Sequence, residues 1–221
     1  MADVVALALT YGCGMAMNHS SSSLDAAAGA SSPDAPDAAA GADSRIAARS
    51  LPAVLAREIG LVVAGAVALT LIGQVALPLP FTPVPVTLGT LAALGVGGVL
   101  GGRRALGSVA LYAAAAAAGA PVLAGWSSGV TSSFGYVLGY ALAAVVAGYA
   151  LSRTADGARR PLLVRLALML LASAVVYIPG LIWLKVATGA AWNTAFVLGL
   201  APFVIGDVLK SVVAALLPLR S

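Results

Sequence analysis

The sequence predicts an all-α integral membrane protein with six transmembrane helices. Of its 221 residues, 61% are hydrophobic and 9% are charged, whereas a soluble domain has about half and about a quarter. Several stretches of about 20 residues carry almost no charged side chain, and a helix of that length crosses a hydrocarbon layer of about 30 Å. These stretches lack the alternation of apolar and polar residues that strands require, so helices are expected.

The first 50 residues differ from the rest of the chain. The segment HSSSSLDAAAGASSPDAPDAAAGADS consists of small and polar residues with almost nothing large to bury. The sequence therefore predicts a disordered, low-complexity tail over residues 1–50, followed by a membrane domain over residues 51–221. The opening MADVVALALTYGCGM has a short apolar stretch and no basic residue, so it is a poor signal peptide.

The first expected span, residues 53–77, ends where a proline-rich segment begins. This segment, LPLPFTPVPVTL at 77–88, cannot be helix interior, because proline lacks the amide hydrogen that a helix needs. It is also too apolar for an ordinary solvated loop. The second and third spans, 86–101 and 105–120, are short, rich in Gly and Ala, and separated by a pair of arginines.

The remaining three spans follow a Gly/Ser-rich loop at 121–134. The fourth span, 135–152, ends before a connection that contains arginines, and the fifth, 162–184, begins after it. The sixth, 191–217, is interrupted by glycine and proline residues.

The basic residues predict the orientation of the bundle. With six spans, all the arginines fall on one side of the membrane, and the opposite side carries only Lys185. The positive-inside rule then places both termini in the cytoplasm of a multi-pass plasma-membrane protein, with the proline-rich loop and the 121–134 loop outside. The arginines are Arg45, Arg49, Arg57, Arg103, Arg104, Arg153, Arg159, Arg160, Arg165 and Arg220.

Small residues form a stripe on the first span. Gly60, Ala64 and Ala68 recur at a spacing of four residues, which places them on one helix face and lets another helix approach closely. Two interpretations remain open, namely packing inside the bundle and docking of a partner membrane protein.

Ionisable residues inside a span are costly and usually mark function. Asp207 and Lys210 lie three residues apart in the sixth span and therefore share a helix face. On a continuous helix, Asn193 falls on the same face. The pair either neutralises itself within the bundle or binds a small molecule, and buried pairs of this kind are poor stabilisers.

The expected outward loops offer further ligand contacts. Trp126 and Tyr136 flank a run of hydroxyl residues, and an aromatic ring beside hydroxyl groups suits a ligand with an apolar ring and a polar edge. Trp126 also fits an interfacial aromatic belt. Gln74, late in the first span, either faces the ligand or makes a hydrogen bond between helices.

Three segments of the membrane domain resemble a known family. They are PFTPVPVTLGTLAALGVGGVLGGRRALGSVALY, GAPVLAGW followed by GYVLGYALAAVVAG, and PFVIGDVLKSVVAALL. They resemble the three signatures of the BioY family, the biotin-specific S components of energy-coupling factor transporters. Departures from the family pattern are Gly89, where a Gln is frequent, and VTSSFGY before the fourth span.

The resemblance implies a six-helix bundle that binds biotin, as transported substrate rather than cofactor, near its outer face. Asp207 and Lys210 match the pair expected to contact biotin, and Tyr136 matches a tyrosine that precedes the fourth helix. A membrane coupling subunit and two cytoplasmic ATPases are the implied partners. The stripe on the first helix is the expected docking face for that coupling subunit.

The proline-rich loop acquires a role from this resemblance. Biotin has a mostly apolar bicycle, a polar urea edge and a carboxylate tail. A rigid, apolar lid containing Phe81, Pro83, Pro85 and Thr87 would seal it from water with little entropy loss, because proline already restricts the chain.

Other functions are excluded or remain as alternatives. The sequence has no G-x-x-x-x-G-K-[ST] loop for binding the phosphates of ATP and no cluster of metal ligands. Its net charge of +4 is spread between apolar runs rather than gathered in a patch that could bind nucleic acid. Its one cysteine allows no intrachain disulfide. With no histidine or thiol in the spans, an enzyme has few acid–base groups. An S component for another vitamin and a purely structural membrane partner remain alternatives.

Overall fold

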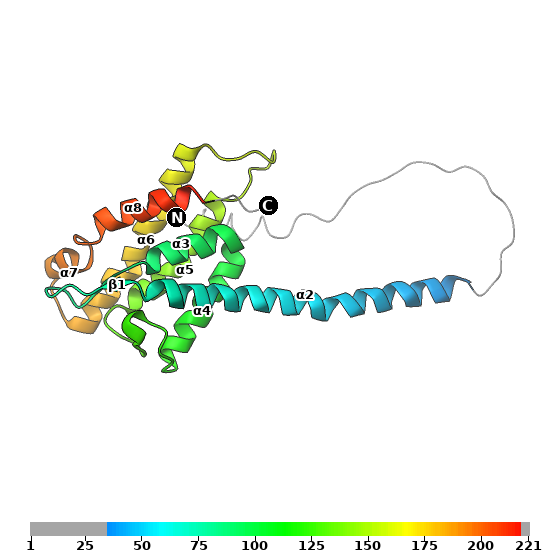
Figure 1. Cartoon of the computed structure of the whole chain (residues 1–221), viewed down its shortest axis with the longest axis horizontal. Helices are drawn as coiled ribbons and strands as arrows, with labels where there is room; N and C mark the ends of the chain where they lie inside the picture. The colour runs from blue at the N-terminus through cyan, green and yellow to red at the C-terminus, as the bar shows by residue number, and fades with distance from the viewer. Residues whose placement is uncertain (1–34, 218–221) are drawn as a thin grey trace. The chain divides into compact units, whose positions relative to one another are not determined.

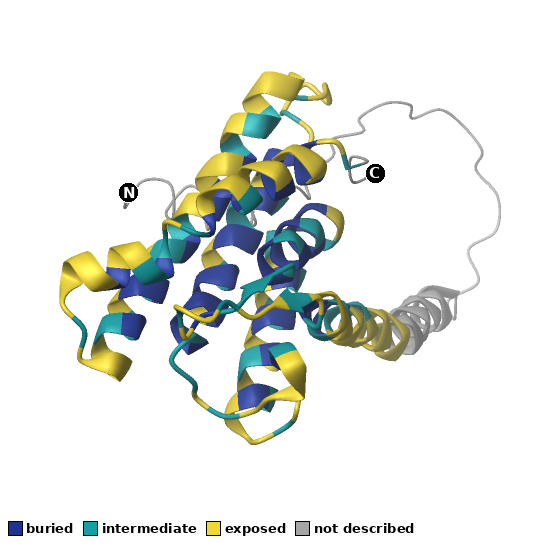
Figure 2. Ribbon diagram, turned by 60° about the vertical axis from the view of Figure 1, so that its left-hand side comes forward, coloured by how far each residue is buried: buried dark blue, intermediate teal, exposed yellow. Residues whose placement is uncertain are grey.

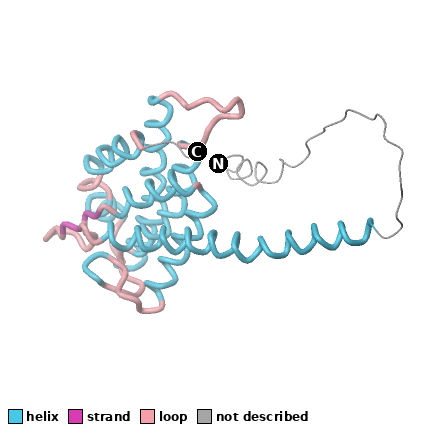
Figure 3. The backbone as a smooth tube through the Cα atoms, turned by 45° about the vertical axis from the view of Figure 1, so that its right-hand side comes forward, coloured by secondary structure: helices cyan, strands magenta, loops and turns pink. Residues whose placement is uncertain are grey.

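The computed structural model describes residues 35–217, of which residues 35–50 are described by backbone alone. The chain divides into two compact units, residues 1–46 and 47–221. Apart from its loops, the described part consists of helices, one short hairpin of strands and a 3-10 turn (Figures 1 and 3). Its helices are α2 (Ala35–Gly73), α3 (Gly89–Leu100), α4 (Gly102–Ala117), α5 (Phe134–Ala150), α6 (Leu162–Thr188), α7 (Trp192–Gly199) and α8 (Val204–Ala215).

The first helix begins earlier than the sequence predicts. Helix α2 includes residues 35–50, which the sequence assigns to the disordered tail, and it continues through Pro52. This segment is rich in alanine, the residue with the highest helix propensity, so it can be helical without a core to bury. The rest of the expected tail, residues 1–34, lies outside the described residues.

Two described helices are long and apolar enough to cross a membrane by themselves. They are residues Leu51–Gly73 of α2 and the whole of α6. The apolar helices α3 and α5 are shorter, with 12 and 17 residues. The helical, membrane-type architecture predicted from the sequence is confirmed at this level.

The expected sixth span is not one straight helix. It consists of α7 and α8, which are bent by 50° at the break between them. Pro202 lies in this break and has no amide hydrogen to donate to Leu198, four residues earlier. The helix therefore stops, and the prediction of a continuous polar face from Asn193 to Asp207 is wrong.

Helix α5 lies at the centre of the bundle, against α3, α4 and α6. A Cβ atom on Gly97 of α3 would collide with the backbone of Ala144, and one on Gly139 would lie 2.6 Å from the carbonyl oxygen of Val176. These glycines therefore let helix backbones touch. The buried residues concentrate on this central helix and the faces turned toward it (Figure 2).

Helix α2 packs against α4 along a different face from its stripe of small residues. A Cβ atom on Gly65 would collide with Ser108, and Glu58 accepts two hydrogen bonds from Arg104, at 2.6 and 2.5 Å. Gly60, in contrast, has no atom within 4 Å of the position of a Cβ.

Candidate ligand-binding site

A cavity lies among α3, α5, α6, α8, the proline-rich loop and the 121–134 loop. Its empty space is about 650 Å³, including the part that is open to solvent. Aromatic and small residues form most of the wall, with a few polar groups among them. The lining residues are Gly73, Val84, Pro85, Thr87, Gly89, Thr90, Tyr112, Leu123, Ala124, Ser133, Tyr136, Val137, Tyr140, Val176, Tyr177, Phe203, Asp207 and Lys210.

The ion pair predicted from the sequence lines this cavity. Lys210 Nζ lies 2.9 Å from Asp207 Oδ1, and the two side chains are only 8% and 9% exposed. The Tyr177 hydroxyl donates to the other carboxylate oxygen, Oδ2. Asp207 lies in the first turn of α8, where the helix dipole favours a negative charge. An ammonium has three donors, so Lys210 retains donors for a ligand.

The break between α7 and α8 is stabilised by two groups beside the cavity. The hydroxyl of Tyr136 donates to the carbonyl of Gly199 at 2.8 Å, and Thr82 donates to the carbonyl of Leu198 at 2.8 Å. These carbonyls need donors because the helix stops at this point. Pro202 therefore ends α7 and lets α8 enter the site at an angle to it. The hydrogen bonds from α5 and the proline-rich loop stabilise this bent arrangement.

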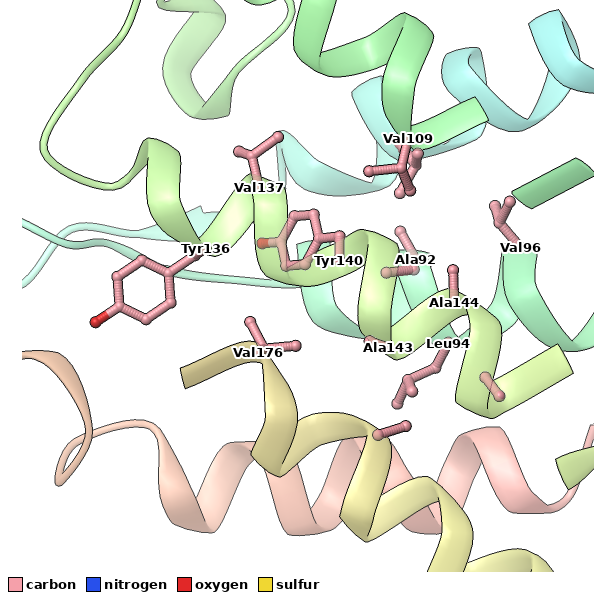
Figure 4. Packing of buried hydrophobic residues seen from close by; sticks show 14 of the residues in the cluster. Ala92, Leu94, Val96, Val109, Tyr136, Val137, Tyr140, Ala143, Ala144 and Val176 are labelled. Atoms are coloured by element: carbon pink, nitrogen blue, oxygen red, sulfur yellow. The ribbon is translucent and has the colours of Figure 1, made fainter. Parts of the chain in front are cut away.

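Four tyrosines and Phe203 form the aromatic part of the wall. The rings of Tyr136 and Tyr177 meet edge to face, with their centroids 6.2 Å apart. Figure 4 shows Tyr136 and Tyr140 projecting from α5, with Val176 of α6 facing them. Tyr140 also interacts with the hydroxyl group of Thr87. Such a wall suits a flat, largely apolar ligand.

The proline-rich loop enters the cavity through only some of its residues. Pro85 and Thr87 line the cavity, whereas Phe81 is 59% exposed and neither it nor Pro83 is part of the wall. Val84, which the sequence analysis did not select, is buried and lines the wall instead.

Backbone pairing holds the ends of this loop together. The strands β1 (Ala76–Leu77) and β2 (Val86–Thr87) form an antiparallel pair. With the anchor from Thr82 to α7, the loop is attached at its base and near its tip.

Three residues expected to contact a ligand do not line the cavity. Gln74 instead donates to the carbonyl groups of Thr70, Val122 and Leu123, and accepts from the amide of Trp126. These bonds tie the end of α2 to the 121–126 segment rather than to another α-helix.

Trp126 and Asn193 lie at the surface. Trp126 is 58% exposed, in the 3-10 turn η1 (Ala124–Trp126). Asn193 is exposed at the start of α7, where its side-chain oxygen accepts from the amide of Thr194 at 2.8 Å.

Sequence reasoning missed three tyrosines that line the cavity, namely Tyr112, Tyr140 and Tyr177. Tyr140 follows Tyr136 by four residues, so the spacing already placed both on one face of α5. Tyr177 has no comparable signal, because a tyrosine in an apolar span also fits ordinary packing. Only the pairing of α6 with α8 brings its hydroxyl to Asp207.

The stripe of small residues on α2 lies apart from the cavity. Gly60 and Ala64 are exposed, whereas Ala68 is partly buried and packs against the core. Most of the stripe is therefore available to another molecule, and only its last residue takes part in internal packing.

The fold is that of a known class of membrane proteins, the S components. It resembles a crystal structure described as the S-component for biotin from an ECF-type ABC transporter, with a TM-score of 0.64 and 24% identity, covering 72% of this chain and 87% of that one. The sequence model of the BioY family matches residues 43–220. The chain therefore belongs to the BioY family, which is a family of membrane transporters.

Individual relatives agree with this assignment. The chain is 35% identical to "Biotin transporter BioY" of Rhizobium etli, over 63% of this chain and 78% of the relative. It is 32% identical to "Probable biotin transporter BioY" of Pyrococcus horikoshii, over 62% and 80% of the two chains. It is 30% identical to "Biotin transporter BioY2" of Lactococcus lactis, over 62% and 76%.

Proposed function

We propose that this chain binds biotin in the cavity and carries it into the cell as the S component of an energy-coupling factor transporter. Membership in the BioY family and the names of its relatives support the ligand. The observation that carries the proposal is the buried pair of Asp207 and Lys210, with the Tyr177 hydroxyl bonded to it, in a wall that is mostly aromatic and apolar. Biotin has the matching chemistry, an apolar bicycle with a polar edge and a charged tail.

Each part of the site has a defined role in this proposal. Lys210 donates to an oxygen of biotin, either the tail carboxylate or the urea carbonyl. Asp207 accepts from a urea N–H or holds Lys210 in position, and Tyr177 keeps the carboxylate oriented. The rings of Tyr136 and Tyr140 pack against the bicycle. The chain performs no covalent chemistry and needs no cofactor, because biotin is the cargo.

The membrane arrangement follows the charge distribution. We infer that residues 51–221 form one six-span domain, with α3, α4 and α5 as short spans and α7 with α8 as one broken span. Both termini are cytoplasmic in this arrangement, and the proline-rich loop and the 121–134 loop face outward. The arginine-rich α5–α6 connection supports it, since Lys185 at the other end of α6 is the only basic residue expected outside.

Release of biotin requires a partner in this proposal. The coupling subunit docks on the stripe of Gly60, Ala64 and Ala68, and two cytoplasmic ATPases drive the change that opens the cavity inward. The exposure of Gly60 and Ala64 supports this docking face. Close helix approach without bulky side chains is the usual basis of association in lipid.

Equilibrium binding of biotin to the purified chain in detergent tests the proposal. We expect tight, saturable binding that other vitamins do not displace. A folded chain that binds no biotin would overturn the assignment. If another vitamin bound more tightly, the chain would be an S component of different specificity.

The lid offers a second test, through the anchor of Thr82 on the carbonyl of Leu198. Replacing Thr82 with Val removes this hydrogen bond, whose net contribution is about 0.5–1.5 kcal/mol. We expect biotin to dissociate up to about tenfold faster, with a smaller change in the association rate, when release is followed after dilution into unlabelled biotin. Thr154→Val is the matched control, because the Thr154 hydroxyl bonds Ala158 in the connection between α5 and α6. An unchanged release rate in Thr82→Val would contradict the role of the loop as a lid.

A further inference from the structure

A second, almost entirely apolar groove lies between α6 and the α7–α8 pair. Its empty space is about 1130 Å³, including the part that is open to the surroundings. Ala174, Ile178 and Ile182 form its α6 side, and Phe196, Val204 and Val208 form the opposite side. Apart from Tyr177 and Asp207, its lining residues differ from those of the ligand cavity, and exposed side chains such as Ile182 and Val204 show that it is open to the surroundings.

The groove cannot remain empty in a membrane. Ile178, Phe196 and Val208 are each 47% exposed in the chain alone, and in a bilayer such surface is covered by hydrocarbon or by another helix. From Ile182 to Leu170 the lining extends along α6 by about 18 Å, at about 1.5 Å per residue. This length is close to the depth of one leaflet, which is half of a hydrocarbon core of about 30 Å.

One end of the groove has a positive charge. Lys185 lies one turn beyond Ile182 on α6, with its Nζ 5.3 Å from the centre of the Trp192 ring, and Trp192 lines the groove. The hydrogen bond from Nζ to the carbonyl of Ala190 is long, at 3.4 Å. Because an ammonium has three donors, Lys185 can also bind an anion at the position where the groove reaches the membrane surface.

We propose that this groove binds one phospholipid of the bilayer, with an acyl chain along α6 and the phosphate at Lys185. A phosphate matches the lysine in charge, and Trp192 beside it has the amphipathic ring that is typical of the headgroup level. The length of the lining and the position of the charge both correspond to a lipid of a single leaflet. An apolar helix of a partner protein could also fill the groove, but it would place no anionic group beside Lys185.

The groove and the ligand cavity share part of one wall. Tyr177 and Asp207 line both. An acyl chain in the groove would cover the outer side of this wall and keep water from the buried carboxylate. By excluding water, the bound lipid would strengthen the hydrogen bond from the Tyr177 hydroxyl to Asp207.

Native mass spectrometry of the full chain tests the proposal without biotin. The protein is purified in detergent, incubated with palmitoyl-oleoyl phosphatidylglycerol, and examined for retained lipid. We expect the parent chain to retain one lipid, and Ile178→Trp to retain about tenfold less, because the larger side chain fills the space that the acyl chain would occupy. Leu171→Trp is the matched control, because Leu171 is 51% exposed on α6 and lies outside the groove.

The charge is tested in the same way. Lys185→Ala should retain less phosphatidylglycerol than the parent, whereas Arg159→Ala, at the opposite end of the bundle, should retain as much. Equal retention by the parent and by Ile178→Trp would overturn the lipid site, and equal retention by Lys185→Ala would overturn the position of the phosphate. A parent that carries no lipid and forms a dimer, which Ile178→Trp dissociates, would assign the groove to a second copy of the chain. Thermal unfolding of each variant shows that it is folded, and none of these results depends on biotin binding.

Discussion

Lys210→Ala is expected to weaken biotin binding severely. Lys210 is buried against Asp207 at 2.9 Å and lines the cavity. Removing one member of a buried, hydrogen-bonded charge pair at a binding site costs about 2–5 kcal/mol, which lowers affinity by about 30-fold to several thousand-fold. Asp207→Asn, which keeps the shape of the side chain, should act in the same direction. Isothermal titration calorimetry on the purified variants measures both effects.

A loss of binding must be separated from a loss of folding. Each single substitution leaves one charge buried without its partner, which destabilises the bundle. The double variant Asp207→Leu with Lys210→Leu removes both charges, and apolar replacement of a buried pair is often neutral or stabilising. We therefore expect this variant to unfold near the temperature of the parent and still bind no biotin. If it bound biotin, the pair would be structural and the site would lie elsewhere.

Ser211→Ala provides the control within the same helix. Ser211 is fully buried next to Lys210 and bonded to Ser173 at 2.8 Å, and it does not line the cavity. Its substitution should cost some stability and leave biotin affinity close to that of the parent. A large loss of affinity here would mean that packing of α6 against α8, rather than direct contact, controls binding.

The sequence located the ion pair because charges are conspicuous in apolar spans. Asp207 and Lys210 stand out wherever the fold places them, since their burial in lipid is costly. Tyr177 does not stand out, because a tyrosine in a membrane helix has many ordinary uses. Its contact with Asp207 depends on which helices are neighbours, and the apolar periodicity of α6 does not specify a neighbour.

Asn193 and Gln74 lie outside the cavity for geometric reasons. The helical wheel that grouped Asn193 with Asp207 assumed a straight helix, although Pro202 lies between them, and the actual bend is 50°. Gln74 is a polar residue late in the first span, but its hydrogen-bond partners belong to a loop whose path the sequence does not predict. Both residues are polar, as a functional residue in a span would be. The direction in which each side chain points depends on the tertiary structure, which the sequence alone does not give.

Ala64→Leu is expected to block transport while leaving biotin binding intact. Ala64 is exposed on α2 and does not line the cavity. A larger side chain at a close helix contact costs about 1–3 kcal/mol, so assembly with the coupling subunit should weaken by about fivefold to more than a hundredfold. Uptake of labelled biotin by cells that express the complete transporter measures the loss, and calorimetry on the purified chain checks that binding is unchanged.

The same substitution at Ala110 separates docking from a general effect of bulk. Ala110 is exposed on α4, so Ala110→Leu adds the same volume to a different helix face. Co-purification with the coupling subunit should fail for Ala64→Leu and succeed for Ala110→Leu. Normal uptake by Ala64→Leu would exclude the stripe as the docking face, because a close helix–helix contact has no room for the added side chain. Parallel loss in both variants would point to a broad contact that involves α4 as well as α2.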